Sequence, residues 1–347
     1  IMGTIYSMEG NMLNKEFLEF NNSIKLENES TVLREKRDLL KKDFQSKFPK
    51  KCESNDIEIK PSDIDFVSQG SFKLNTTIKS QNKEVDLDLG VIFPLDILEY
   101  EDSRKIKVLG KKALEITGVR LPVIKEPCVT VSYVKGGEET IHLDFPMYAE
   151  YDGELYLARG KENGKYSWEV ADPRGLNDYI ISKITSETMQ PRRIIRYLKK
   201  WKQIAYSSNA TTEKKPPSIG LTLLVVDSLV EDESDLIAFR NVCARIRDQF
   251  TVVTDAQGNI VSAKITKLLP VKPFTDVFKK FERSDSHAID FYKKISKAIN
   301  NLDNALNCDN EHDAAVYVSK VLGEDFPIPE KEIKKASTIV NEEHSFG

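Results

Sequence analysis

The sequence predicts an α+β protein of two units: a mixed N-terminal unit of strands and helices, and a C-terminal helical unit. Before Pro173, short runs rich in β-branched and aromatic residues alternate with helical patterns. After Pro173, most segments show the apolar spacing of helices. A chain of 347 residues is also longer than one ordinary core requires. We therefore expect a first unit over residues 14–185, a helical unit over 186–330 and a polar tail over 331–347.

Composition narrows the class of protein. Hydrophobic residues make up 40% of the chain and charged residues 31%, which is typical of a globular protein rather than a disordered one. The net charge of −4 disfavours a general nucleic-acid coat, so phosphate binding needs a local basic patch. The longest apolar run, residues 219–230, is interrupted by polar residues and is too short to span a bilayer.

Cysteine usage and the N-terminus favour a cytoplasmic protein. The four cysteines are far apart and form no CxxC pair, which disfavours a zinc site or a disulfide framework. The N-terminus lacks the basic and then apolar layout of a signal peptide. The cysteines are Cys52, Cys128, Cys243 and Cys308.

The expected elements follow from periodicity and turn residues. A Gly-Gly pair and an Asn-Gly pair mark the turns of two hairpins in the first unit. In chain order, we expect a helix over 29–48, a strand, turn and short helix over 62–72, a strand over 83–93, a helix over 107–118, and hairpins over 128–148 and 153–173. The C-terminal unit is expected to hold helices over 175–187, 191–207, 218–230, 236–250, 277–306 and 312–323.

Two aspartates occupy the strand "KEVDLDLGVIF". Because side chains alternate along a strand, Asp86 and Asp88 share one face. Two neighbouring carboxylates repel each other, and their burial without partners is costly. A divalent cation such as Mg²⁺ resolves this conflict, since it prefers carboxylate and phosphate oxygens. Asp144 is a third acid on a strand, and a trio of converging acids suits two-metal phosphoryl or nucleotidyl transfer.

The Gly-Ser pair upstream makes the aspartates more informative. An Asp-x-Asp pattern alone is more often a solvated strand edge than a site. Gly70 permits close approach of the backbone to a phosphate, and the Ser71 hydroxyl and nearby amides can donate to it.

This combination resembles a known family. "GSF…T…EVDLDLGV" followed by "HLDF" is similar to nucleotidyltransferases of the polymerase-β superfamily, and more closely to the cGAS/DncV-like nucleotidyltransferases that make cyclic oligonucleotides in bacterial anti-phage (CBASS) systems. The segment "WEVADPRG", the helix "RRIIRYLKKWK" and the ending "VYVSKVLGEDFPIP" also resemble this family. The resemblance implies a polymerase-β-like core of mixed sheet and helices, a helical lobe, and an active site in the cleft between them.

The basic helix near residue 195 gains a role from this resemblance. Arg192, Arg196 and Lys199 form a basic stripe, which on an arbitrary helix would be a solvated face. The resemblance implies that Lys199 contacts a nucleotide triphosphate and that Ser218 also touches the nucleotide. Ser218 is also suited to cap a helix N-terminus, a role that is compatible with contact to the nucleotide.

The resemblance also implies cofactors and partners. It implies that Asp86, Asp88 and Asp144 hold two Mg²⁺ ions, or Mn²⁺, and that Gly70, Ser71, Lys199 and Ser218 bind the NTP. The product would be a cyclic di- or trinucleotide that acts on a downstream effector. CBASS accessory proteins are conceivable partners, either an E1/E2-like pair that conjugates Gly347 or a peptide-binding regulator. We expect no membrane association and no stable nucleic-acid complex.

Two other functions use overlapping features. One is a nucleotidyltransferase that makes linear oligonucleotides or modifies RNA or protein with the same residues. An RNA-modifying enzyme should also carry a large basic surface, and the net charge of −4 is mild evidence against it. The other is a catalytically inactive scaffold, which would be expected to have lost at least one of the three acids.

Overall fold

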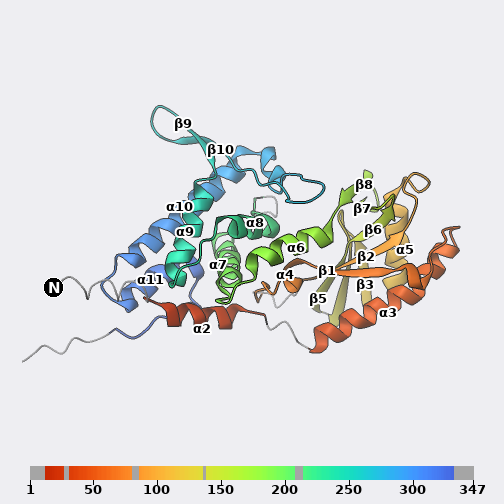
Figure 1. Cartoon of the computed structure of the whole chain (residues 1–347), viewed down its shortest axis with the longest axis horizontal. Helices are drawn as coiled ribbons and strands as arrows, with labels where there is room; N and C mark the ends of the chain where they lie inside the picture. The colour runs from red at the N-terminus through yellow and green to blue at the C-terminus, as the bar shows by residue number, and fades with distance from the viewer. Residues whose placement is uncertain (1–11, 27–30, 80–85, 136–137, 208–213, 332–347) are drawn as a thin grey trace, which may run out of the picture.

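A computed structural model describes residues 12–26, 31–79, 86–135, 138–207 and 214–331. The molecule is elongated, with a sheet-containing lobe at one end and a helical lobe at the other (Figure 1). Each lobe has its own cluster of buried apolar residues. Helix α6 (Pro173–Ile184) runs between the two lobes.

The sheet is organised around strand β2, which holds the Asp-x-Asp sequence. Strand β1 pairs antiparallel with one edge of β2, while β5 and then β6 pair parallel with the other edge. Strand β4 pairs antiparallel with β5, and β7 pairs antiparallel with β6. Because β6 follows β5 along the same edge of β2, the first residues of β4 lie near the last residues of β7. The strands are β1 (Asp65–Gln69), β2 (Asp86–Pro94), β3 (Arg120–Ile124), β4 (Val129–Lys135), β5 (Glu138–Phe145), β6 (Met147–Tyr151), β7 (Glu154–Gly160) and β8 (Tyr166–Ala171).

Two helices pack beside this sheet and close its core. Helix α3 (Thr31–Glu53) contributes Phe44 and Phe48, whose rings stack with centroids 4.4 Å apart. Helix α5 (Ser103–Leu114) begins at an Asp102 cap, and Asp102 accepts a hydrogen bond from the Arg104 amide. Both helices bury an apolar stripe, as amphipathic sequences do when they cover a sheet.

The helical lobe is built around α7 (Gln190–Ala205). Its buried Tyr197 is packed against Phe17, Phe20 and Phe239, and its hydroxyl donates to the main-chain oxygen of Phe17. The surrounding elements are α2 (Asn14–Ile24), α8 (Ser218–Ser228), α9 (Asp235–Arg247), the 3-10 helix η2 (Lys279–Arg283), α10 (Asp285–Leu306) and α11 (Glu311–Leu322). A separate hairpin of β9 (Thr251–Thr254) and β10 (Ile260–Lys264) projects from this lobe (Figure 1).

The structure corrects several sequence expectations. Residues 277–306 do not form one helix, because Ser284 has an extended backbone between η2 and α10. Strands β3, β6, β9 and β10 and helix α2 were not predicted. Helix α2 lies within the range expected for the first unit, yet its apolar face packs in the core of the helical lobe. Pairing partners and the docking of a short helix are set by tertiary contacts, which local patterns do not record.

Among the helices that the structure describes, none combines the length and the apolar character that a bilayer crossing requires.

Candidate functional site

Two of the three predicted acids lie directly opposite each other on neighbouring strands. In the parallel pairing of β2 with β5, Asp88 is in register with Asp144, and position 86 is in register with His142. The Asp144 carboxylate accepts a hydrogen bond of 2.5 Å from the buried Thr130 hydroxyl on β4, which fixes its orientation. The backbone of Asp86 begins β2, while its side chain lies outside the described part of the structure.

Gly70 packs its α-carbon against Asp88. It is the first residue of the short helix α4 (Gly70–Lys73) and has a left-handed φ of 69°. A β-carbon at this position would stand 1.9 Å from Asp88 Oδ2 and 2.9 Å from Asp88 Cγ. Glycine is therefore required twice, for its backbone conformation and for the room that the Asp88 carboxylate occupies.

Ser71 lies beside Gly70 at the start of α4 and joins α4 to the loop that follows. The Ser71 hydroxyl is 3.1 Å from the Thr77 hydroxyl, and the Ser71 carbonyl accepts a hydrogen bond from the Thr76 amide at 2.9 Å. The predicted nucleotide-binding pair Gly70-Ser71 is thus held between the acids and the loop over residues 74–77.

The basic stripe of α7 is not a solvated face. Arg192, Arg196 and Lys199 donate to the successive main-chain oxygens of residues 74, 75 and 76, at 3.3, 2.5 and 3.0 Å. Arg196 and Lys199 are buried, with exposed fractions of 4% and 8%. The stripe therefore ties the helical lobe to the loop that follows the Gly-Ser helix.

Lys199 and Lys202 both face the space above this loop. Burial, together with the neighbouring cations Lys202 and Arg196, lowers the pKa of Lys199 to about 7, while Asp88 acts in the opposite direction. Burial also lowers the pKa of Lys202 to about 8, together with nearby Lys280 and Lys215. A bound anion would restore the charged form of either ammonium, as expected at a phosphate-binding site.

Ser218 has a different local role from the one that the helix pattern allowed. The residue at the cap of α8 is Pro217, and Ser218 is the first residue of the helix with no capping hydrogen bond from its side chain. Its hydroxyl accepts a hydrogen bond of 3.0 Å from Lys202 Nζ instead. The capping alternative is therefore wrong, and Ser218 points toward the same cations as the predicted nucleotide site.

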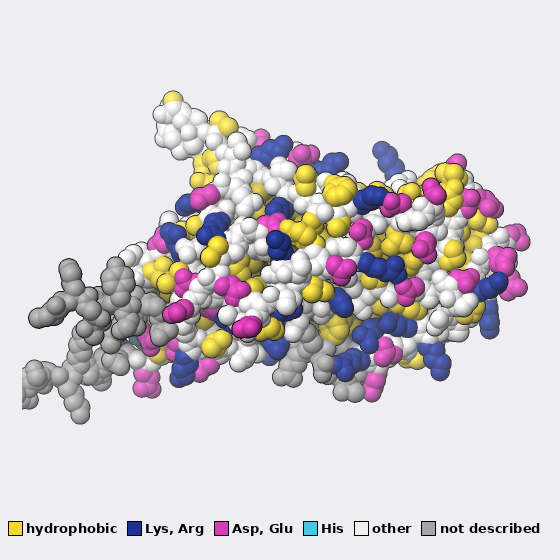
Figure 2. Space-filling model, viewed as in Figure 1, with side chains coloured by type: hydrophobic (Ala, Val, Ile, Leu, Met, Phe, Trp, Pro, Cys, Tyr) yellow, Lys and Arg dark blue, Asp and Glu magenta, His cyan; other side chains and the backbone are white. Residues whose placement is uncertain are grey.

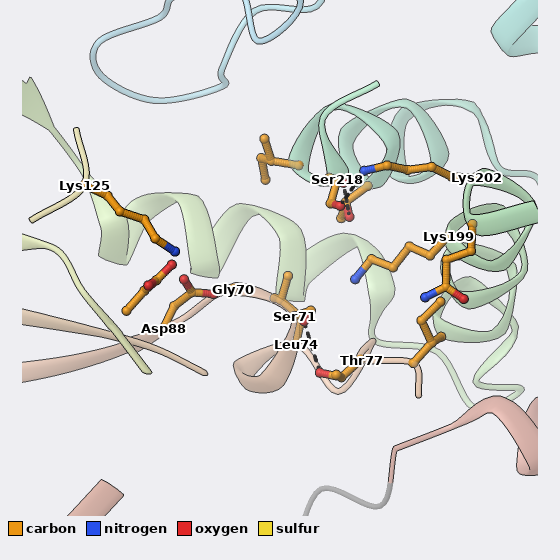
Figure 3. Close-up of a pocket in the computed structure, with 14 residues that line it drawn as sticks. Gly70, Ser71, Leu74, Thr77, Asp88, Lys125, Lys199, Lys202 and Ser218 are labelled. Carbon is orange, nitrogen blue, oxygen red and sulfur yellow. Dashed lines mark hydrogen bonds between the residues drawn. The ribbon is translucent and has the colours of Figure 1, made fainter. Parts of the chain in front are cut away.

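These residues line one cavity. It has a volume of about 520 Å³ and lies between the two lobes (Figure 3). Its lining residues include Gly70, Ser71, Asp88, Asp144, Lys199 and Ser218. Six of the seven predicted site residues thus line one space, and the seventh, Asp86, is placed only by its backbone. On the face drawn in Figure 2, basic and acidic side chains are interspersed.

The sequence analysis assigned no site role to the other eight lining residues, which include Lys125, Lys202 and Gln203. Lys125 comes from the turn between β3 and β4 and points toward Asp88 (Figure 3). Lys202 and Gln203 come from the last turn of α7. The basic composition of α7 indicated Lys202. Lys125 lies in the turn "IKEPC", and its position at the cavity depends on the pairing of β3 with β4, which the sequence pattern does not record.

The segment "WEVADPRG" is explained by the junction between the lobes. Asp172 caps α6 by accepting a hydrogen bond of 2.7 Å from the Gly175 amide, and Pro173 occupies the first helical position. The Trp168 indole donates to the Tyr100 carbonyl at 2.9 Å. Further along α6, Asn177 donates to the Ser68 carbonyl on β1. The Asn177 contact joins α6 directly to the strand that leads into Gly70.

The residues suit a hard divalent cation. Asp88 and Asp144 supply carboxylate oxygens from adjacent strands, and Mg²⁺ favours such ligands together with phosphate oxygens. Among the residues whose side chains are described, no group of three His, Cys, Asp or Glu residues is arranged to hold a metal. The third predicted ligand is Asp86, whose side chain is not among them.

Comparisons with known proteins agree with this geometry. Residues 64–148 match the family model for the nucleotidyltransferase domain of cyclic GMP-AMP synthases of the DncV-like type. A cyclic GMP-AMP synthase of Escherichia albertii is 27% identical over 204 residues, which covers 55% of this chain and 44% of that protein. The match thus spans less than half the length of that relative.

Solved structures share the fold. DncV of Vibrio cholerae, bound to the linear intermediate 5′ pppA(3′,5′)pG, superposes with a TM-score of 0.68 at 17% identity, over 91% of this chain and 96% of that one. The apo form of the same enzyme gives a TM-score of 0.67 at 18% identity, over the same shares of the two chains. Residues 64–148 therefore resemble the nucleotidyltransferase domain of the DncV-like type, and the chain as a whole shares the fold of DncV.

Proposed function

We propose that this chain is a metal-dependent nucleotidyltransferase that condenses NTPs into a cyclic di- or trinucleotide second messenger. The observation that carries the proposal is the register of Asp88 with Asp144 beside Gly70, in a cavity that also holds the cations of α7. The relative from E. albertii is a cyclic GMP-AMP synthase, and the DncV structures hold GTP or a linear dinucleotide, which supports this class of substrate and product.

The donor nucleotide is expected to lie between the Gly-Ser helix and α7. Gly70 lets the backbone approach the phosphates, and the Ser71 hydroxyl can donate to them. Lys199, Lys202 and Ser218 line the helical-lobe side of the same cavity and can bind the outer phosphates. A triphosphate would then be held from both lobes at once.

The three acids would hold the metal ions at the end of the cavity where the reaction takes place. Asp86, Asp88 and Asp144 would hold divalent cations, for which Mg²⁺ is the first candidate and Mn²⁺ the second, and two ions are the expected number. Metal ions at such a site neutralise charge that develops on the phosphates. Thr130 keeps the Asp144 carboxylate aimed at the acceptor side.

The reaction balances without any further reagent. A ribose hydroxyl of the acceptor attacks the α-phosphorus of the donor, and its proton passes to Asp144 or to solvent. The bond between the α-phosphorus and the bridging oxygen breaks, and pyrophosphate leaves with the electron pair. Ring closure repeats the step, with the triphosphate of the linear product as donor.

The biological setting extends the proposal. A cyclic oligonucleotide made on phage infection would bind a downstream effector, as in CBASS defence in the cytoplasm. Conjugation through Gly347 by an E1/E2-like pair, or control by a peptide-binding regulator, would belong to the same setting. Gly347 lies outside the described residues, so the tail hypothesis stays a prediction from sequence. Deleting Gly347 should abolish conjugates in cells that carry the whole operon, and unchanged conjugates would contradict it.

Product analysis tests the proposed activity. The purified protein is incubated with the four labelled NTPs and Mg²⁺, and separately with Mn²⁺, and the products are treated with phosphatase and identified by mass spectrometry. We expect a phosphatase-resistant product without free ends that disappears in the double variant Asp86→Asn with Asp88→Asn. A linear product would favour the oligonucleotide-extending alternative, and transfer to added RNA or protein would favour a modifying enzyme. Undiminished turnover in the double variant would refute the assignment of the acids.

A further inference from the structure

The turn between β3 and β4 places a lysine at the acid end of the cavity. Lys125 is exposed, lines the cavity together with Asp88 and Asp144, and points toward Asp88 (Figure 3). It reaches the cavity from the sheet-containing lobe, whereas Lys199 and Lys202 reach it from α7 in the helical lobe. The cavity therefore has cations at both ends, contributed by different lobes.

The buried ammonium of Lys107 binds the backbone of this turn. Lys107 on α5 has an exposed fraction of 0%, and its Nζ donates to three main-chain oxygens. These are the oxygens of Lys125 at 2.6 Å, Glu126 at 2.8 Å and Gly160 at 2.7 Å. A lysine ammonium has three N–H donors, so the three carbonyls satisfy it completely. This arrangement offsets the cost of burying the charge and joins α5, the turn and the end of β7 at one point.

Other contacts fix the same turn. The Gly160 amide donates to the Glu126 carbonyl at 3.0 Å, and the Lys125 amide donates to the Cys128 carbonyl at 3.0 Å. Arg159 on β7 donates to the Glu126 carboxylate at 2.7 Å through Nε. The backbone of Lys125 is thus held rigidly while its side chain extends into the cavity. Such an arrangement is typical of a side chain that positions a ligand.

We propose that Lys125 binds phosphate oxygens of the acceptor nucleotide and that Lys107 is a positioning residue that holds the Lys125 turn. The proposal rests on the proposed function, because only a transfer between two nucleotides gives the site a second triphosphate. Lys125 lies on the Asp144 side, away from the donor cations of α7. The triphosphate of the acceptor must stay within the cavity. In ring closure its α-phosphorus is attacked, and pyrophosphate leaves.

A plain alternative is that Lys125 only balances the charge of the acids. In that case its removal would strengthen the binding of divalent cations and leave the choice of acceptor unchanged. A phosphate-binding lysine predicts the reverse, because its loss removes a contact that only a phosphorylated acceptor makes. The two roles are therefore separable by comparing acceptors with and without phosphates.

The test uses a donor that cannot act as acceptor. An α-labelled 2′,3′-dideoxynucleoside triphosphate is supplied with either a ribonucleoside triphosphate or the matching nucleoside as acceptor, for each of the four bases. In the wild-type protein, kcat/KM should favour the phosphorylated acceptor. We expect Lys125→Gln to reduce that preference about tenfold through KM, Lys125→Arg to keep it, and Lys107→Met to lower it without changing the KM of the donor. Lys105→Gln, an exposed lysine on α5, is the matched control.

Binding measurements keep this inference separate from the proposed activity. Calorimetry with non-hydrolysable GTP and ATP analogues and Mg²⁺ should give two sites per chain, the weaker of which loses about tenfold in affinity in Lys125→Gln. If the wild-type protein makes no transfer product but shows this loss, the proposed activity fails and the Lys125 contact stands. An unchanged acceptor preference together with unchanged binding in Lys125→Gln would overturn the inference, even if Lys107→Met destabilises the fold.

Discussion

Replacing Gly70 by alanine perturbs the site through a single methyl group. The new β-carbon would stand 1.9 Å from Asp88 Oδ2, where ordinary contact begins at 3.4 Å, so one of the two groups must move by about 1.5 Å. The left-handed backbone, with φ of 69°, adds a cost of about 1–2 kcal/mol for any residue with a β-carbon. Relief of the overlap costs a further amount of about 1–3 kcal/mol.

The expected loss of activity exceeds the loss of stability. A displacement of about 1 Å at a reacting centre can lower a rate about 100-fold, so Gly70→Ala should reduce kcat by at least about 100-fold. Gly118→Ala is the matched control, because Gly118 has a similar φ of 75° but no atom within 4 Å of its β-carbon position. The control should lose about 1–2 kcal/mol of stability and keep its activity.

Turnover and chemical denaturation of both variants, measured side by side, test this reasoning. The overlap predicts that Asp88→Ala in the Gly70→Ala background recovers part of the lost stability, since the clashing carboxylate is gone. Gly70→Ala with turnover close to that of Gly118→Ala would show that the close approach to Asp88 has no catalytic importance.

Three further predictions concern the cations and the acid at the acceptor side. Because burial lowers the pKa of Lys199 to about 7, its amine is mostly neutral at pH 8, and a bound triphosphate should raise that pKa, so NTP binding should take up protons. Calorimetry in buffers of different ionisation heats measures this uptake, and Lys199→Gln should reduce it. Thr130→Val removes the hydroxyl that donates to Asp144 and should lower kcat about tenfold with little change in NTP affinity, as single-turnover and binding assays would show. Arg196→Met leaves two buried acceptors without their donor and should lower the free energy of unfolding by about 2–3 kcal/mol in a denaturant titration, and an effect below about 1 kcal/mol would contradict its structural role.

The acids and the Gly-Ser turn could be predicted because the patterns that indicate them lie within a few neighbouring residues of the sequence. The alternation of a strand puts Asp88 on a defined face, and a glycine next to a serine at a strand end marks a turn without any knowledge of the fold. The convergence of Asp144 with Asp88 was expected only on the condition that their strands lie side by side. The parallel pairing of β2 with β5 meets that condition.

Lys125 and Lys107 could not be predicted in the same way. Lys125 stands in a turn whose flanking strand β3 was not expected, and its distance from Asp144 along the sequence conceals that β4 brings the two together. Lys107 lies on a helix with several other lysines, and its sequence context does not distinguish a caged ammonium from a solvated one. The three main-chain oxygens that accept from Lys107 come together only because the turn before β4 lies next to the end of β7.

The basic stripe of α7 was predicted for its charge, and the structure gives that charge a second use. A solvated cationic helix would attract phosphates from a distance, but Arg196 is buried and donates to the Asn75 carbonyl. Lys199 is bonded to the Thr76 carbonyl and hydroxyl at 3.0 and 3.1 Å, and it also lines the cavity. A triphosphate that reaches Lys199 therefore meets an amino group that is already hydrogen-bonded to the loop that follows Ser71. Under the proposed function, binding of the donor and the position of the Gly-Ser helix would be linked through this one side chain, and residues from two separate cores would then act as a single site.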